Sequence, residues 1–120
     1  MTTDAHSGSN YEAQDTPLHI DGEAHLESVV DEHDVVLVDF FATWCGPCQM
    51  LEPVLETLAA ETDAVIAKVD VDQHQVLASE YGVRGVPTLL LFADGEQVDQ
   101  HVGALPADRL RQLIDAHTDE

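Results

Sequence analysis

VDFFATWCGPC, residues 38–48, joins a dense apolar run to the two cysteines of the chain. The run spans residues 35–42 and is apolar at both odd and even positions apart from Asp39, which is typical of a strand buried on both faces. The cysteines follow directly, and residues 47–61 then place leucines at helical spacing. The stretch therefore predicts a buried strand, a tight turn that carries both cysteines, and a helix.

Strand and helix patterns alternate on both sides of this stretch. We expect strands at 18–20, 64–71, 88–92 and 97–102, and helices at 24–32, from a cap at Asp72 to Gly82, and from Pro106 onward. Asp94-Gly95 separates the last two strands and is a strong signal for a β-hairpin. The order β-α-β-α-β-α-β-β-α predicts an α/β fold, with helices on both faces of a mostly parallel sheet and an antiparallel edge.

The length of 120 residues fits one domain with one hydrophobic core. We interpret residues 1–17 as a flexible acidic N-terminal extension and residues 18–120 as the folded domain. Residues 1–15 contain neither lysine or arginine nor an apolar run, so we expect no secretory signal or transit peptide. No apolar stretch approaches the length of a membrane span, and we expect a cytoplasmic protein.

The chain is strongly acidic, with 24 Asp and Glu against 4 Lys and Arg and a formal net charge of -20. This charge argues against binding to nucleic acids and to anionic membrane surfaces, both of which attract basic proteins. One interpretation is an ordinary solvated acidic surface. The other is adaptation to high salt, where the repulsion between carboxylates is screened. We favour the second because Lys68 is the only lysine, and the composition resembles that of proteins from salt-accumulating archaea.

The Cys-x-x-Cys spacing has three possible meanings. A zinc site needs four ligands, and the chain could supply the other two only from scattered histidines, so we expect no metal. A purely structural disulfide is uncommon in a cytoplasmic protein. Redox chemistry is favoured because the cysteines open a helix, where free backbone N–H groups and the helix dipole stabilise a thiolate.

The position of each cysteine predicts its role. Cys45 lies at the helix tip, so we expect it to be the exposed nucleophile with a lowered thiol pKa. Cys48 follows one turn later on the same face, within disulfide reach, and should be the partly buried resolving thiol. Pro47 is expected at the first helical position, where its missing N–H is not needed.

Four blocks of sequence carry a resemblance to one family. They are residues 38–48, Ala67-Lys68-Val69-Asp70, Tyr81-Gly82-Val83-Arg84-Gly85-Val86-Pro87-Thr88 and Val102-Gly103-Ala104. Together they resemble thioredoxin in order and spacing from about residue 18 to the C-terminus. The resemblance implies the thioredoxin fold, a five-stranded mixed sheet flanked by four helices. It also implies a general protein disulfide reductase without a cofactor, re-reduced by a thioredoxin reductase and acting on disulfide-containing proteins as a monomer.

Asp39 is a carboxylate inside an apolar strand. It could lie at a sheet edge and face water, but the residues around it are apolar at both odd and even positions, which favours burial. A buried carboxylate needs a partner or takes up a proton, and Lys68 in the other dense strand is the obvious candidate. In thioredoxins the matching Asp and Lys lie beneath the cysteine pair. The resemblance thus implies that Asp39 is the general base for Cys48, with Lys68 beside it.

The resemblance also implies a substrate groove beside the cysteines. In the family the proline matching Pro87 is cis and faces the disulfide, and the backbone of Val86 would pair with an extended segment of the substrate. The expected substrate-binding residues are Trp44, Gly46, Pro47, Gly85, Val86, Pro87 and Gly103.

Two residues depart from the usual family pattern. Phe41 stands where many thioredoxins have a second tryptophan, and Gln49 stands where a lysine is common. An oxidase or isomerase and a redox-inactive binding module are alternative functions. Gly-Pro between the cysteines favours reduction over oxidation, and the presence of both cysteines and Asp39 argues against an inactive scaffold.

Overall fold

Strand β2, Val35–Phe41, is buried along its whole length at the centre of a five-stranded sheet. The computed structural model describes residues 15–118. One neighbour of β2 is β3, Val65–Asp70, and the other is β4, Thr88–Ala93. β2 has a paired strand on each side and a helical layer on each face, so no edge of it meets water. This is why its sequence is apolar at both odd and even positions.

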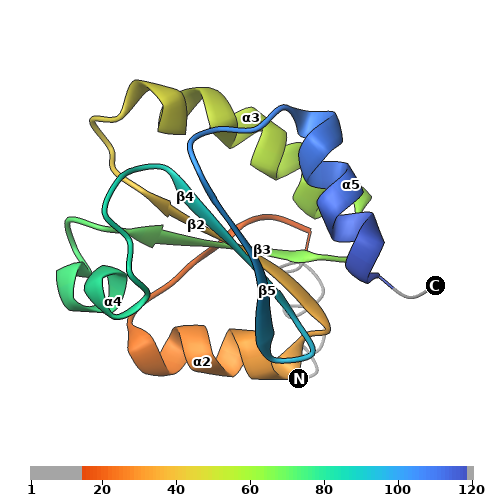
Figure 1. Cartoon of the computed structure of the whole chain (residues 1–120), viewed down its shortest axis with the longest axis horizontal. Helices are drawn as coiled ribbons and strands as arrows, with labels where there is room; N and C mark the ends of the chain where they lie inside the picture. Colours follow the sequence, from red (N-terminus) through yellow and green to blue (C-terminus); the bar gives the residue numbers. More distant parts are fainter. Residues whose placement is uncertain (1–14, 119–120) are drawn as a thin grey trace, which may run out of the picture.

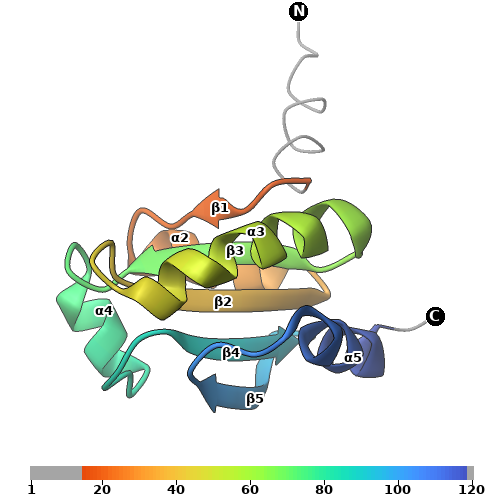
Figure 2. The same ribbon diagram turned by 90° about the horizontal axis from the view of Figure 1, so that it is seen from above.

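The sheet has the strand order β1-β3-β2-β4-β5, with β1 at Leu18–His19 and β5 at Glu96–Val102 (Figure 2). Strands β1 and β2 run parallel to β3, whereas β4 is antiparallel to β2 and β5 is antiparallel to β4. The expected mixed sheet is confirmed, but antiparallel pairing already begins at β4 and is not confined to the last edge. The physical reason is the short helix α4, Gln75–Glu80, which at about 1.5 Å per residue cannot return the chain to the far end of the sheet.

Helices cover both faces of the sheet, as predicted (Figure 1). Helix α2, Glu23–Glu32, and α4 cover one face, and α3, Gly46–Glu61, and α5, Ala107–His117, cover the other. Each pair has its own apolar core, one built around Leu26 and Phe40 and the other around Leu55 and Leu110. The even-numbered side chains of β2 serve the first core and the odd-numbered ones the second, so Asp39 faces the α3–α5 layer.

The β4–β5 hairpin turns at Asp94 and Gly95, which have φ angles of 54° and 84°. Both residues lie in the left-handed region that a two-residue type I′ turn requires, and Asp-Gly suits this turn because Gly has no side chain to clash. The predicted hairpin is confirmed.

The start of α4 differs from the prediction. The helix begins at Gln75 after His74 and has no side-chain cap, so Asp72 does not cap it. Residues 71–73 instead form a turn, in which the backbone N–H of His74 donates to the carbonyl of Asp70 at 3.0 Å. This extra turn moves the helix start three residues beyond Asp72 and leaves the Asp72 carboxylate free for another partner.

Two further sequence-based expectations concern the chain ends and membranes. Residues 1–14 of the predicted N-terminal extension lie outside the described residues. Among residues 15–118 no helix has the length and apolar character needed to cross a membrane.

Candidate active site

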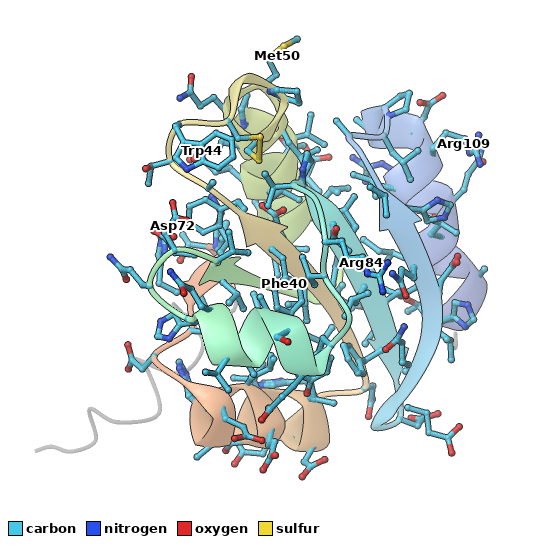
Figure 3. All side chains as sticks on the ribbon, turned by 60° about the vertical axis from the view of Figure 1, so that its left-hand side comes forward. Phe40, Trp44, Met50, Asp72, Arg84 and Arg109 are labelled. Atoms are coloured by element: carbon cyan, nitrogen blue, oxygen red, sulfur yellow. A yellow bond between two sulfur atoms is a disulfide. The ribbon has the colours of Figure 1, made fainter. Side chains whose placement is uncertain are left out.

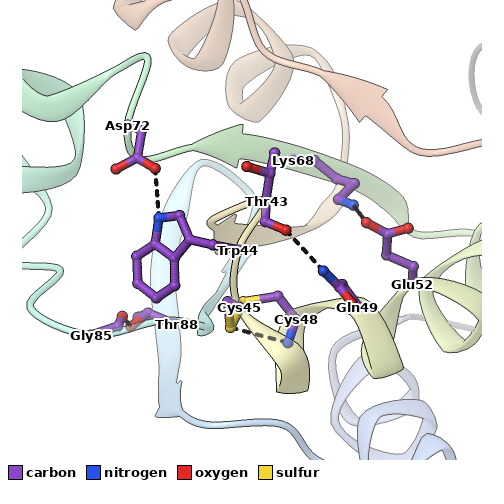
Figure 4. The surroundings of a disulfide bond; sticks show 10 residues. All are labelled: Thr43, Trp44, Cys45, Cys48, Gln49, Glu52, Lys68, Asp72, Gly85 and Thr88. Carbon is purple, nitrogen blue, oxygen red and sulfur yellow. Dashed lines mark hydrogen bonds and ion pairs between the residues drawn. A yellow bond between two sulfur atoms is a disulfide. The ribbon is translucent and has the colours of Figure 1, made fainter.

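Cys45 and Cys48 form a disulfide at the N-terminus of α3, with their Cα atoms 5.2 Å apart (Figure 4). Cys45 is the N-cap residue of the helix, and its Sγ accepts a hydrogen bond from the backbone N–H of Cys48 at 3.2 Å. Pro47 is the second helical residue rather than the first, because the helix already begins at Gly46. The cap places one sulfur against the positive end of the helix dipole, where a negative charge is stabilised.

Both cysteines are more buried than expected. Cys45 is 4% exposed and Cys48 is 1% exposed, so the expectation that Cys45 is exposed is wrong for this disulfide form. The cause is a small apolar cluster in which Phe41 and Ala42 pack on the cysteines, with Val86 against its side. Cys45 is still the more accessible of the two, in the predicted order.

Trp44 is 69% exposed and lies beside the disulfide (Figures 3 and 4). Its indole N–H donates to the carboxylate of Asp72 at 2.8 Å, which ties the turn before α3 to the turn after β3. The large apolar side chains of Met50 and Val102 are also mostly exposed, at 77% and 71%. An exposed apolar side chain beside a reactive pair, as Trp44 is, can contact a partner protein.

The loop from Gly85 to Thr88 forms the other wall of the site. The Val86–Pro87 peptide bond is cis, as expected, and Val86 packs against the cysteine cluster. The Pro87 carbonyl accepts a hydrogen bond from the N–H of Gly103 at 2.8 Å. Gly103 has φ of 101°, a conformation that favours glycine. The structure therefore brings Trp44 and Val86 to the disulfide and holds Gly103 next to Pro87, the residue after Val86.

Asp39 is fully buried, and neither carboxylate oxygen has a hydrogen-bond partner among the described residues. Lys68 is paired with it in the β2–β3 register, as expected of neighbours on one sheet face. The ammonium, however, binds the Oε2 atom of Glu52 at 3.3 Å and lies 4.3 Å from the centroid of the Phe41 ring. No hydrogen bond or ion pair therefore joins Asp39 to Lys68, because the lysine ammonium binds a carboxylate on α3, but its positive charge still lowers the pKa of Asp39.

The surroundings of Asp39 favour its neutral form. Burial raises the pKa of Asp39 from 3.8 to about 7, the positive charge of Lys68 opposes the rise, and the negative charge of Glu52 adds to it. An acid with this pKa is half-protonated near neutral pH and can exchange a proton there.

Sequence reasoning missed two residues of this site, Glu52 and Asp72. Glu52 lies four residues after Cys48 on α3, so helical spacing alone would have placed it on the face that carries the resolving cysteine. The role of Asp72 had no local signal, because its indole partner is 28 residues away in the chain.

Within residues 15–118 no group of three or more His, Cys, Asp or Glu side chains is arranged to hold a metal ion. The reactive features that the described residues bring together are a dithiol pair at a helix N-terminus and a buried acid on the strand that leads to it. This fold and this site define a thiol–disulfide oxidoreductase.

The thioredoxin family model matches residues 16–116, and the chain belongs to the thioredoxin family. It is 54% identical to the thioredoxin of Chlamydia caviae over 85 residues, which is 70% of this chain and 83% of the relative. It is 42% identical to thioredoxin 2 of Chlorobaculum tepidum over 113 residues, which is 92% of this chain and 97% of that one. Family membership with the cysteine pair intact identifies a protein disulfide reductase.

The solved structures show the same fold. A single-residue mutant of the thioredoxin from Halobacterium salinarum superposes with a TM-score of 0.87 at 59% identity, over 90% of this chain and 96% of that one.

Proposed function

We propose that Cys45 is the nucleophile and Cys48 the resolving thiol of this reductase. The observation that carries the assignment is the N-cap position of Cys45, whose Sγ accepts the backbone N–H of Cys48 at 3.2 Å. In the reduced protein the same donor and the helix dipole would stabilise a Cys45 thiolate. Cys48, at 1% exposed, has less access to a substrate.

The proposed reaction transfers two electrons to the target. The Cys45 thiolate attacks one sulfur of the target disulfide, which forms a mixed disulfide and releases the other target sulfur as a thiolate. Cys48 then loses its proton and attacks the Cys45 sulfur. This step breaks the mixed disulfide, releases the second target thiolate and forms the Cys45–Cys48 disulfide seen here. A reductase must return two electrons and two protons for the next cycle.

We propose Asp39 as the base that receives the Cys48 proton. It lies two residues before Phe41 on the same strand face, and Phe41 packs against both cysteines. The raised pKa of about 7 lets the carboxylate take up a proton at neutral pH without holding it permanently. Lys68 would assist by limiting the rise of that pKa.

We propose the surface around the disulfide as the substrate groove. Trp44, held by Asp72, forms one side, and the Gly85–Pro87 loop with Gly103 forms the other. An extended segment of the target would lie between them and pair with the backbone of Val86, with Gly46 and Pro47 at the end of the groove. Disulfide-containing proteins and a thioredoxin reductase are the proposed partners, met by a monomer in the cytoplasm.

Selective alkylation tests the assignment of the cysteines. At about pH 6 a stabilised thiolate is populated whereas an ordinary thiol of pKa about 8.5 is not. We therefore expect a limiting amount of iodoacetamide to label the reduced protein at Cys45 first, as measured by peptide mass spectrometry. The unfolded reduced protein is the control, in which both cysteines should react at similar rates. Preferential labelling of Cys48 in the folded protein would reverse the proposed roles.

We also propose that the acidic surface is an adaptation to high salt. The net charge of -20 supports this, as does the 59% identity to a thioredoxin from Halobacterium salinarum. At about 1 M salt the Debye length is only about 3 Å, so repulsion between surface carboxylates is largely removed.

We expect the melting temperature at pH 7.5 to rise by about 10 °C or more from dilute buffer to 2 M KCl, because screening relieves the repulsion among carboxylates. Circular dichroism melts would measure it. At about pH 4, where many carboxylates are protonated, the same salt step should raise the melting temperature much less. Equal rises at both pH values would indicate a general salt effect and contradict the proposal, as would a melting temperature that salt does not change.

A further inference from the structure

Glu52 is a carboxylate that has no part in the proposed reaction, although it lies on the helix that carries the cysteines and binds Lys68. It follows Cys48 by one turn of α3, so both side chains lie on the same side of the helix. Its Oε2 atom is 3.3 Å from the Nζ atom of Lys68. The side chain of Glu52 is 48% exposed and that of Lys68 only 7%, so this ion pair joins a buried cation to the surface.

The Lys68 ammonium is bonded to only one of the two carboxylates that surround it. Asp39 is its neighbour across the β2–β3 register but accepts no hydrogen bond from it, whereas Glu52 accepts one. The Phe41 ring, 4.3 Å from Nζ to its centroid, supports the ammonium in this position. Asp39 is therefore left as a buried acid whose nearest cation is bound elsewhere.

We propose that Glu52 is a positioning residue for disulfide reduction, which holds the Lys68 ammonium away from Asp39 and keeps Asp39 able to receive the Cys48 proton. This inference rests on the proposed role of Asp39 and extends it. Had Lys68 bound Asp39 directly, the carboxylate would be stabilised as an anion and would be a weaker base.

The two charges around Asp39 act on its pKa in opposite directions. Lys68 on β3 lowers the pKa of Asp39 and Glu52 on α3 raises it, while the register partner on β4 is the apolar Leu89. Removing the charge of Glu52 ends its repulsion and releases Lys68 toward Asp39. Both changes lower the pKa of Asp39, so their effects add.

Other titratable groups lie on the solvent side of the ion pair. Glu52 and Lys68 line a surface cavity of about 590 Å³ together with His19, Asp21, Asp70 and His74. These four side chains are the same in the parent and in a Glu52 variant, so a comparison of the two proteins cancels their contribution.

Glu52→Gln is the test, because it removes the charge and keeps the shape. The carboxyl carbon of Asp39 would be followed by ¹³C NMR during a pH titration of the oxidised protein. We expect its midpoint to fall by about 0.5 to 1 pH unit, less than for a fully buried partner because Glu52 is half-exposed. Glu56→Gln is the matched control, since Glu56 is an exposed glutamate one turn further along α3 and the charge change is identical.

The second readout is the single-turnover release of target thiols by the reduced protein as a function of pH. In Glu52→Gln the acid limb of the pH–rate profile should shift to lower pH, by the same number of pH units as the Asp39 midpoint. The rate at high pH should fall about two- to threefold, because a weaker base accepts the proton less readily. The parent and variant profiles should therefore cross, which a simple loss of structure would not produce.

The outcomes separate this inference from the role of Asp39 itself. If Glu52→Gln shifts the Asp39 midpoint and the rate profile no more than Glu56→Gln does, the positioning role is overturned. In an Asp39→Asn background, Glu52→Gln should no longer move the rate profile, and a persistent shift would also overturn it. A different result would show that Asp39 is not the base. In that case the ratio of the parent rate to the Asp39→Asn rate would be the same at every pH.

Discussion

Replacing Cys45 with serine is expected to reduce disulfide reductase activity to the uncatalysed background. A serine hydroxyl is not ionised near neutral pH and cannot form a mixed disulfide, so the first step of the reaction is lost. Reduction of a protein disulfide substrate, followed by thiol release, would measure the loss. The melting temperature of the reduced variant should stay close to that of the reduced parent, which shows that the fold is retained.

Cys48→Ser is the matched comparison, because it should lose turnover and still react once. Cys45 would attack the target, and without a resolving thiol the mixed disulfide would accumulate. Non-reducing electrophoresis should therefore show covalent adducts for Cys48→Ser and none for Cys45→Ser. Adducts of Cys45→Ser alone would contradict the proposed order of attack. Adducts captured from a native lysate by Cys48→Ser would also identify the target proteins.

The parts of the fold that could be predicted are those that local patterns determine. The run at residues 35–42 predicted a buried strand, because a strand is apolar at both odd and even positions only when both of its faces are covered. Asp94-Gly95 predicted its hairpin because the turn needs left-handed residues. The antiparallel direction of β4 could not be predicted, since it depends on where the short α4 leaves the chain in space.

The candidate site divides in the same way. The adjacency of Asp39 and Lys68 follows from strand patterns and was predicted, but the choice of partner by the lysine was not. That choice depends on how α3 packs over the sheet and brings Glu52 within reach of a flexible side chain. The bond from Trp44 to Asp72 likewise joins two turns that only the folded chain brings together. Long-range contacts of polar side chains leave no periodic pattern in the sequence.

Asp39→Asn is expected to stabilise the oxidised protein at neutral and alkaline pH. Burial raises the pKa of Asp39 in the folded state to about 7, against 3.8 for an ordinary Asp. The unfolded chain thus releases this proton at lower pH than the folded chain, and the parent loses stability as the pH rises from about 4 to about 7. Asparagine has no such loss. We expect a gain of about 2–4 kcal/mol in the free energy of unfolding above pH 7, with about 1.36 kcal/mol for each pKa unit.

Denaturant melts of both oxidised proteins at several pH values would measure this gain. Below about pH 4 Asp39 is neutral in both states, so the two proteins should be nearly equally stable there. Above pH 7 the Lys68 ammonium has no buried anion beside it in the variant, but it keeps its bond to Glu52, which limits the offset. A gain that is the same at all pH values would mean that folding does not change the pKa of Asp39, and would contradict the prediction.

The same substitution should slow the resolving step in a way that depends on pH. The asparagine side chain keeps the shape of Asp39 but cannot accept the Cys48 proton, so we expect thiol release to slow by about ten- to a hundredfold near pH 7, toward the lower end of general-base effects. Above about pH 9 most unassisted thiols are ionised, and the defect should shrink. A single-turnover pH–rate profile of Asp39→Asn against the parent measures this, and Glu56→Gln serves as a control for loss of one acidic group. An equal defect at every pH would assign Asp39 to structure or substrate docking and remove it from the proposed mechanism.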